Sequence, residues 1–253
     1  MGISGYLKWP LLCIRFLSYH KTQRLKLVSE AGQEVLIPLF FNEKVMGLLS
    51  KFFSNAKKPS GFLGKIMVNG MNGGGHAAMA SWALEAVEIP EDYKILDIGC
   101  GGGGNIARML KRVHKGSVMG IDFSTVSVEK SLKVNAKAVK EGRCQVTEGN
   151  VASLPFEKGM FDMVTAFETI YFWPDIEHCF NEVKKVLKPG GRFVIVNESD
   201  GSGPMDAKWE NLIEGMHTYR PEEIRTLLSN TGFSNINIQK NEAKHWLMVT
   251  AEK

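Results

Sequence analysis

The stretch KILDIGCGGGG, residues 94–104, decides the fold of this chain. A short apolar run reaches Asp97, and the next seven residues include five glycines, before NIARMLKRV (105–113) takes up helical spacing. Glycines allow the main chain to turn sharply and to approach a ligand closely, because they carry no Cβ. Five glycines in one turn are destabilising unless a ligand must come close to the main chain. The pattern therefore predicts a strand, a ligand-binding turn and a helix.

Outward from this stretch, apolar runs and helical patterns alternate along the chain. Strands are predicted at 94–100, 117–123, 144–150, 161–168, 192–199, 234–241 and 245–253, and helices at 105–113, 124–142, 175–187 and 221–232. Alternation of this kind predicts parallel strands joined by right-handed crossovers. The last two strands are joined by too few residues for a crossover, so they should pair antiparallel. We expect a three-layer α/β domain with a seven-stranded, mostly parallel sheet.

Composition excludes several other classes of protein. Of the 253 residues, 44% are hydrophobic and 23% are charged, which is typical of a globular protein rather than a disordered one. The four cysteines are far apart and form no C-x-x-C pair, so neither a zinc cluster nor a disulfide framework is expected. No other metal-ligand spacing is present, so no metal is predicted, and the cytoplasm is the expected location.

Charge is distributed unevenly between two predicted parts of the chain. Residues 1–58 hold nine Lys or Arg and three acids, whereas residues 59–253 hold 22 and 24. The slightly acidic body gives no support for nucleic-acid binding. We interpret residues 1–58 as a basic, apolar extension that is either loosely ordered or packed on the body. Its segment 6–26 could instead make weak contact with the anionic surface on the inner face of the membrane.

The glycine turn fits two nucleotide-binding patterns. One is G-x-G-x-x-G at Gly99, Gly101 and Gly104, and the other is D-x-G-x-G-x-G, which starts at Asp97 and includes Gly103. Asp122 ends the next predicted strand, where an acid accepts hydrogen bonds from ribose hydroxyls. The residues therefore predict a nucleoside cofactor, and the patterns alone do not say whether it is a nicotinamide dinucleotide.

Four segments in order resemble the class I S-adenosylmethionine-dependent methyltransferases. They are ILDIGCGGGG (95–104), GIDFS (120–124), GNVASLPFEKGMFDMV (149–164) and EVKKVLKPGGRFVIV (182–196). LPF followed by FD and LKPGG is similar to the small-molecule branch, such as ubiquinone/menaquinone-type methyltransferases. The resemblance implies in-line methyl transfer from S-adenosylmethionine to a small organic acceptor. The alternatives are a nicotinamide-dependent oxidoreductase and a non-catalytic, cofactor-binding or membrane-recruited protein.

The resemblance also implies a set of cofactor-binding residues. The glycines would pass beneath the methionine part, with Asp97 near its ammonium, while Asp122 holds the ribose. Residues beside the adenine would follow the second and third strands, and the end of the fourth strand would lie near the sulfonium. The family often has Asp where this chain has Asn150, which leaves the adenine geometry open. The full set is Asp97, Gly99, Cys100, Gly101, Gly103, Asp122, Phe123, Asn150, Val151, Phe167 and Glu168.

Three segments could build the acceptor pocket, namely 71–84, 168–175 and 197–219. The ranges 66–84 and 199–219 are candidate lids. A dedicated base is needed only if the acceptor is protonated at working pH, and the candidate catalytic residues are His76, Glu168 and Tyr171. The acceptor, the methylated atom and the oligomeric state stay open. The candidate pocket residues are Met71, Asn72, His76, Tyr171, Phe172, Trp173, Trp209, His217 and Tyr219.

Overall fold

We describe the protein from a computed structural model. It covers the backbone at 5–9, 12–19, 22–28 and 34–38, and then residues 74–203, 206, 210–211 and 213–253, with side chains from residue 76 onward. The predictions for Met71, Asn72 and Trp209 therefore lie outside the described residues. Among the described residues, no helix combines the length and the apolar character that crossing a membrane requires.

The N-terminal region contains four strands that the sequence analysis did not predict. These are β1 (Gly5–Trp9), β2 (Leu12–Tyr19), β3 (Thr22–Val28) and β4 (Glu34–Pro38). They pair in chain order, and each pair is antiparallel. The basic, apolar segment 6–26 thus lies largely within strands.

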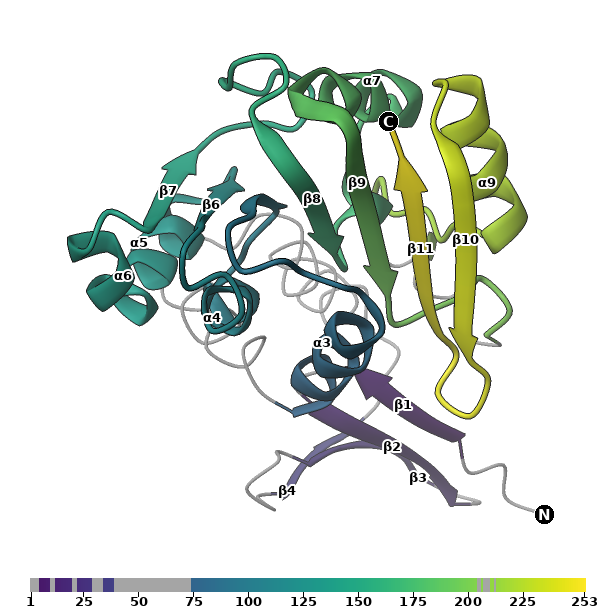
Figure 1. The fold of residues 1–253 in the computed structure, drawn as a ribbon. Helices are drawn as coiled ribbons and strands as arrows, with labels where there is room; N and C mark the ends of the chain where they lie inside the picture. The colour runs from purple at the N-terminus through teal and green to yellow at the C-terminus, as the bar shows by residue number, and fades with distance from the viewer. Residues whose placement is uncertain are drawn as a thin grey trace.

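The body of the protein is built on a seven-stranded sheet with the order β10-β11-β9-β8-β5-β6-β7 (Figure 1). Its strands are β5 (Lys94–Ile98), β6 (Ser117–Asp122), β7 (Cys144–Glu148), β8 (Phe161–Phe167), β9 (Leu187–Asn197), β10 (Ser234–Asn241) and β11 (Trp246–Glu252). The five strands from β5 to β9 pair in parallel, and β11 runs antiparallel to both β9 and β10. This confirms the predicted sheet and its C-terminal hairpin.

Helices cover both faces of the sheet, which completes the three layers (Figure 1). One face carries α3 (Gly74–Ala86), α4 (Gly104–Leu110), α5 (Thr125–Val134) and α6 (Ala136–Lys140). The other face carries α7 (Ile176–Val186) and α9 (Pro221–Asn230), and the 3-10 helix η1 (Ile170–Phe172) follows β8. In the central strand β8, Val164 and Ala166 pack toward α7 and α9, while Met163 and Phe167 pack toward α3 and α4. Side chains that alternate between two buried faces explain why the strand is mostly apolar.

Two predicted elements differ from the structure. The long helix expected at 124–142 is interrupted at Asn135, whose φ of −104° and ψ of 19° are not helical. The Asn135 amide donates to the carbonyl oxygens of Ser131 and Gly103, so the break ties this helix to the glycine turn. Strand β9 begins at Leu187, before the Pro-Gly-Gly segment that was expected to precede it. Leu187 pairs with Phe161, and the register shifts before Arg192 pairs with Met163.

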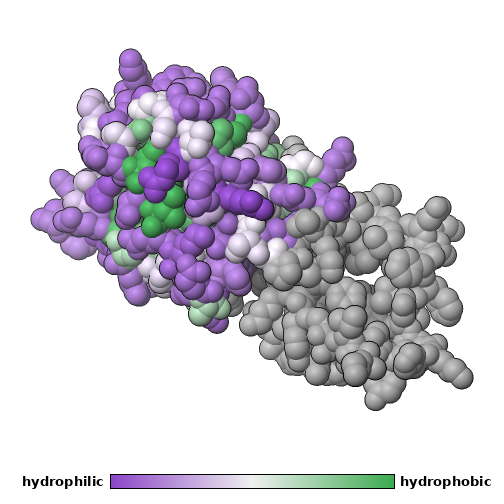
Figure 2. Space-filling model, turned by 90° about the vertical axis from the view of Figure 1, so that its right-hand side faces the viewer, coloured by the Kyte–Doolittle hydropathy of each residue, from purple (hydrophilic) through white to green (hydrophobic). Residues whose placement is uncertain are grey.

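The outer edge of the sheet beside α9 is only partly covered. Figure 2 shows this side of the molecule, where apolar residues reach the surface within a mostly hydrophilic face. Here the edge strand β10 carries Ile236 and Ile238, which are partly buried and pack against the core. This edge lies at the far end of the sheet from β7, away from the glycine turn that joins β5 to α4.

Candidate functional site

The glycine turn is held against the end of β6 by main-chain hydrogen bonds. The N–H groups of Gly99 and Cys100 both donate to the carbonyl of Ile121, at 2.7 and 3.2 Å. The N–H of Gly103 donates to the carbonyl of Cys100 at 3.0 Å, which closes the turn before α4 begins. Gly99, Gly101 and Gly103 have φ values of 69°, 51° and 78°, in the left-handed region that favours glycine.

These three glycines differ in what surrounds them. A Cβ on Gly99 would lie 3.0 Å from the Cβ of Thr169, and one on Gly103 would lie 2.8 Å from the Cα of Ser131. A Cβ on Gly101 would meet no atom within 4 Å. Gly99 and Gly103 are therefore required by the protein's own packing, whereas Gly101 leaves bare main chain beside open space. Close approach of a ligand is the reading that fits Gly101.

Asp122, at the end of β6, anchors the turn from the neighbouring strand. Its Oδ2 accepts a hydrogen bond from the N–H of Gly101, and its Oδ1 accepts one from the N–H of Ser124, both at 2.9 Å. The side chain is only 7% exposed, and burial raises the pKa of its carboxyl group, against the opposing effect of these N–H donors. Each carboxylate oxygen has a further lone pair, so the group can still accept from ribose hydroxyls.

Asp97 lies beneath the turn and does not line the pocket described below. It is fully buried, and its Oδ1 accepts a hydrogen bond of 2.7 Å from the hydroxyl of Thr165 in β8. Burial raises the pKa of Asp97 to about 7, and the nearby Asp122 carboxylate adds to this rise. Asp97 thus supports the turn from the core, and its predicted approach to a ligand ammonium stays a prediction.

A pocket open to solvent extends over the turn, with about 450 Å³ of atom-free space that includes part of the open solvent. Its walls come from α3, the turn, the start of α4 and the end of β8, which the crossover topology brings to one edge of the sheet. Sequence reasoning missed Met79, Asn105 and Arg108, although Asn105 and Arg108 lie three residues apart in the helix directly after the glycines. The lining residues are His76, Met79, Gly99, Cys100, Gly101, Gly102, Gly104, Asn105, Arg108, Phe167 and Glu168.

The three residues predicted beside an adenine follow β6 and β7 at the same edge of the sheet. Phe123 is 37% exposed, which is unusual for a large apolar side chain among the residues that the structure describes. Asn150 is exposed, and its Oδ1 accepts a hydrogen bond of 3.0 Å from the N–H of Ala152. Val151 is buried. This hydrogen bond fixes the amide oxygen of an exposed side chain whose NH₂ group can donate to a base.

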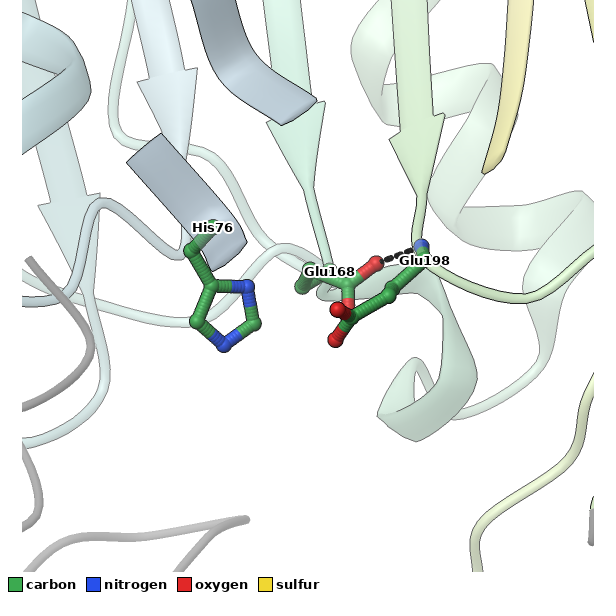
Figure 3. Close-up of side chains that lie close together, drawn as sticks. All are labelled: His76, Glu168 and Glu198. Carbon is green, nitrogen blue, oxygen red and sulfur yellow. Dashed lines mark hydrogen bonds between the residues drawn. The ribbon is translucent and has the colours of Figure 1, made fainter. Parts of the chain in front are cut away.

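Three titratable side chains lie close together, namely His76 and Glu168, which line the pocket, and Glu198 (Figure 3). Their closest ligand atoms all lie within 4.8 Å of one another. Glu168 has a φ of 61°, and its Oε1 accepts hydrogen bonds from the hydroxyl of Tyr171 and from the N–H of Glu198. Burial raises the pKa of Glu168, and the negative charge of Glu198 raises it further. Burial lowers the pKa of His76 to about 4, so its imidazole is neutral at pH 7.

The aromatic candidates after β8 separate into different surroundings. Tyr171 is buried, and its hydroxyl accepts from the N–H of Ser199 while it donates to Glu168, so it orients the acid from behind. Phe172 is partly buried. Trp173 does not line the pocket: it packs in the core, stacked on Phe193 at a centroid distance of 6.2 Å.

The segment after β9 returns to the same region. The N–H of His217 donates to the carbonyl of Tyr171 at 2.9 Å, which fixes the segment over η1. The His217 side chain is 53% exposed and lies 3.6 Å from Glu210, and its ring contacts Tyr219 edge-on at 4.5 Å. Tyr219 itself packs against the core beside α7. The structure thus places His217 and Tyr219 near the candidate site without placing either among the lining residues.

Part of this chain is similar in sequence to known methyltransferases. A family model described as "Methyltransferase domain" matches residues 96–195. The chain is 32% identical over 112 residues to 24-methylenesterol C-methyltransferase 2 of Arabidopsis thaliana, across 44% of this chain and 31% of that protein. It is 37% identical over 112 residues to demethylmenaquinone methyltransferase of Lactococcus lactis, across 44% of each chain. The matches thus span less than half the length of these curated relatives.

A solved structure supports the same fold across more of the chain. The crystal structure of a SAM-dependent methyltransferase from Aquifex aeolicus aligns with a TM-score of 0.62 and 17% identity. The alignment covers 74% of this chain and 97% of that one. It therefore extends the shared fold beyond residues 96–195. Neither the family nor these relatives support the alternative of a nicotinamide-dependent oxidoreductase.

Proposed function

We propose that this chain, a member of the class I S-adenosylmethionine-dependent methyltransferases, transfers the methyl group of that cofactor to a small organic acceptor. One observation carries the proposal. Gly101 lines a pocket, and its main chain borders open space just after the carboxyl end of β5 in a methyltransferase fold. Internal packing requires glycine at Gly99 and Gly103, whereas Gly101 combines a left-handed φ with main chain that is left open to a ligand.

The described residues suit each part of the cofactor. Asp122 retains acceptor capacity toward the ribose, and the exposed Phe123 with Asn150 would flank the adenine. Arg108 lines the pocket and provides a cation for the methionine carboxylate. Phe167 and Glu168 would then lie on the side of the sulfonium, since they line the pocket at the end of β8.

The chemistry requires little of the protein beyond placement. The sulfonium already carries a good leaving group, so the enzyme mainly holds the acceptor in line with the methyl group and excludes water. Helix α3 contributes His76 and Met79 to the pocket, which makes it a cover over the transfer site. If the acceptor atom is protonated, His76 or Glu168 is placed to take the proton, and Tyr171 positions Glu168 for this.

An apolar organic acceptor is the class we favour. The relatives named above are a sterol and a demethylmenaquinone methyltransferase, and both names describe apolar substrates. Recruitment to the inner face of the membrane through residues 6–26 would bring the enzyme to such acceptors, because this segment is basic and apolar. Co-sedimentation with anionic and with neutral vesicles tests this part. Binding that is equal for both, or absent, would remove it.

Labelled methyl transfer tests the proposed function. The full-length protein is incubated with S-adenosylmethionine labelled in its methyl group and a metabolite extract, and the labelled product is identified by mass spectrometry. We expect label in a small apolar compound, and less label with Gly101→Ala when the cofactor concentration is below saturation. A calorimetric titration with the cofactor accompanies it. Failure to bind the cofactor would refute the proposal, whereas tight binding without any transfer would favour a non-catalytic binding protein.

A further inference from the structure

His76, Glu168 and Glu198 bring one imidazole and two carboxylates together from three distant parts of the chain. His76 comes from α3, Glu168 follows β8 and Glu198 follows β9, and Figure 3 shows their side chains close together. The closest ligand atoms lie within 4.8 Å of one another. Two carboxylates placed so close repel each other unless a proton or a cation lies between them.

One nitrogen of the His76 imidazole lacks a hydrogen-bond partner among the described residues. This atom, Nε2, is buried. A buried polar atom without a partner costs free energy, so such an atom at a functional edge indicates a ligand. The neutral ring offers a nitrogen lone pair, which is the form in which histidine binds metals.

The hydrogen bonds that Glu168 accepts from the described residues go to one of its two carboxylate oxygens. Both hydrogen bonds that it accepts, from the Tyr171 hydroxyl and from the N–H of Glu198, go to Oε1. No hydrogen bond to Oε2 is found within the described part of the chain. Outer partners that fix one oxygen of a carboxylate while leaving the other for a cation are typical of metal sites.

We propose that His76, Glu168 and Glu198 form a binding site for a divalent transition cation of the Mn²⁺ or Zn²⁺ class. One imidazole nitrogen and two carboxylate oxygens suit these cations, and three protein ligands leave coordination positions open. Ligand atoms around one such cation lie about 3–4 Å apart, so small side-chain movements would complete the site. This departs from the sequence-based expectation of no metal, because the three ligands are 30 or more residues apart in the chain and leave no local motif.

The open positions suggest what the cation would do, and this part rests on the proposed methyltransferase function. Glu168 and His76 also line the pocket, so the cation would face the transfer site. An acceptor with an enolate, phenolate or similar oxygen could coordinate it and be held in line with the methyl group. The two carboxylates would offset the charge of the dication, which would otherwise disfavour the nearby sulfonium.

Metal titration of the full-length protein tests the site without any measurement of activity. After treatment with a chelator, the protein is titrated with Mn²⁺ while the electron paramagnetic resonance signal of free Mn²⁺ is recorded, and separately with Zn²⁺ by calorimetry. We expect one cation per chain, with affinity weakened roughly tenfold or more in His76→Gln and Glu198→Gln. The matched controls His114→Gln and Glu148→Gln alter exposed residues outside the cluster and should bind like the wild type.

Electron spin-echo measurements separate a ligand role from a structural one. Bound Mn²⁺ in the wild type should show coupling to an imidazole nitrogen, and this coupling should be absent in His76→Gln. Thermal unfolding without metal shows whether His76→Gln and Glu198→Gln fold. If one of them does not fold, metal binding by the other variant tests the proposal. Absence of stoichiometric binding of either cation, or equal binding in both cluster variants, would overturn the proposal. Cofactor titration of the metal-free protein is scored separately, so failure of the metal site leaves the proposed function intact.

Discussion

Replacing Gly101 by alanine adds one methyl group to the surface that we assign to the cofactor. The new Cβ meets no protein atom within 4 Å, so the change introduces no clash inside the protein. The φ of 51° puts alanine in the left-handed region, which costs about 1–2 kcal/mol. We therefore expect a modest loss of stability for Gly101→Ala, and a protein that still folds.

The added methyl group should lower cofactor affinity, because it occupies space that we assign to the cofactor. A ligand resting on the main chain at Gly101 would have to move away or be displaced, and we expect affinity for S-adenosylhomocysteine to fall by at least about tenfold, or about 1.4 kcal/mol. Isothermal calorimetry measures this affinity, and urea unfolding measures the stability.

Gly103→Ala is the matched control, because its new methyl group contacts the protein itself and not the space that we assign to the cofactor. Its φ is 78°, and its Cβ would lie 2.6 Å from the Asn135 amide nitrogen and 2.8 Å from the Cα of Ser131. Overpacking of this kind adds about 1–3 kcal/mol to the left-handed strain. We expect Gly103→Ala to lose clearly more stability than Gly101→Ala. If Gly101→Ala binds the cofactor as tightly as the wild type, the reasoning about the turn is wrong.

Three other variants probe the groups around the turn. Asp122→Ala should weaken cofactor binding by about 1–3 kcal/mol in calorimetry, because alanine leaves the N–H groups of Gly101 and Ser124 without an acceptor. Asp122→Asn should weaken it less. If Asp122→Ala binds the cofactor as tightly as the wild type, the ribose is bound elsewhere. Asn135→Ala removes the amide that donates to Gly103, and should lower unfolding free energy by about 1–3 kcal/mol; an unchanged urea midpoint would contradict this. Between pH 4 and 7 the folded protein keeps a proton on Asp97 that the unfolded chain releases, since burial raises this pKa to about 7 from 3.8. Stability contributed by Asp97 should therefore fall with rising pH, and Asp97→Asn should gain on the wild type by up to about 1.4 kcal/mol per pH unit in that window. A constant difference between the two would contradict the assignment.

The parts of the fold that could be predicted are those in which local pattern and tertiary packing agree. Strand β8 is mostly apolar because both of its faces are buried, and a cluster of glycines directly after a strand is typical of a turn that approaches a ligand. The interruption at Asn135 could not be predicted, since the sequence around it is helical in pattern. It arises from a tertiary hydrogen bond to Gly103.

The candidate site divides in the same way. Its cofactor side is formed by short segments at strand ends, where residue type alone suggests a role. The acceptor side is formed by residues from separate elements, and their meeting depends on the packing of α3 and of the segment after β9. Trp173 illustrates the difficulty, because an aromatic residue after β8 suits a pocket or a core equally well, and the structure places it in the core. Arg108 was missed because a lysine or arginine on a helix is usually solvated.

The most direct test of the account is a crystal structure of the protein with S-adenosylhomocysteine. We predict that the thioether portion lies against the main chain at Gly101 and that both ribose hydroxyls donate to Asp122, in addition to the N–H donors already present. A ligand bound at another edge of the sheet, or a turn that stays empty at saturating ligand, would contradict the account.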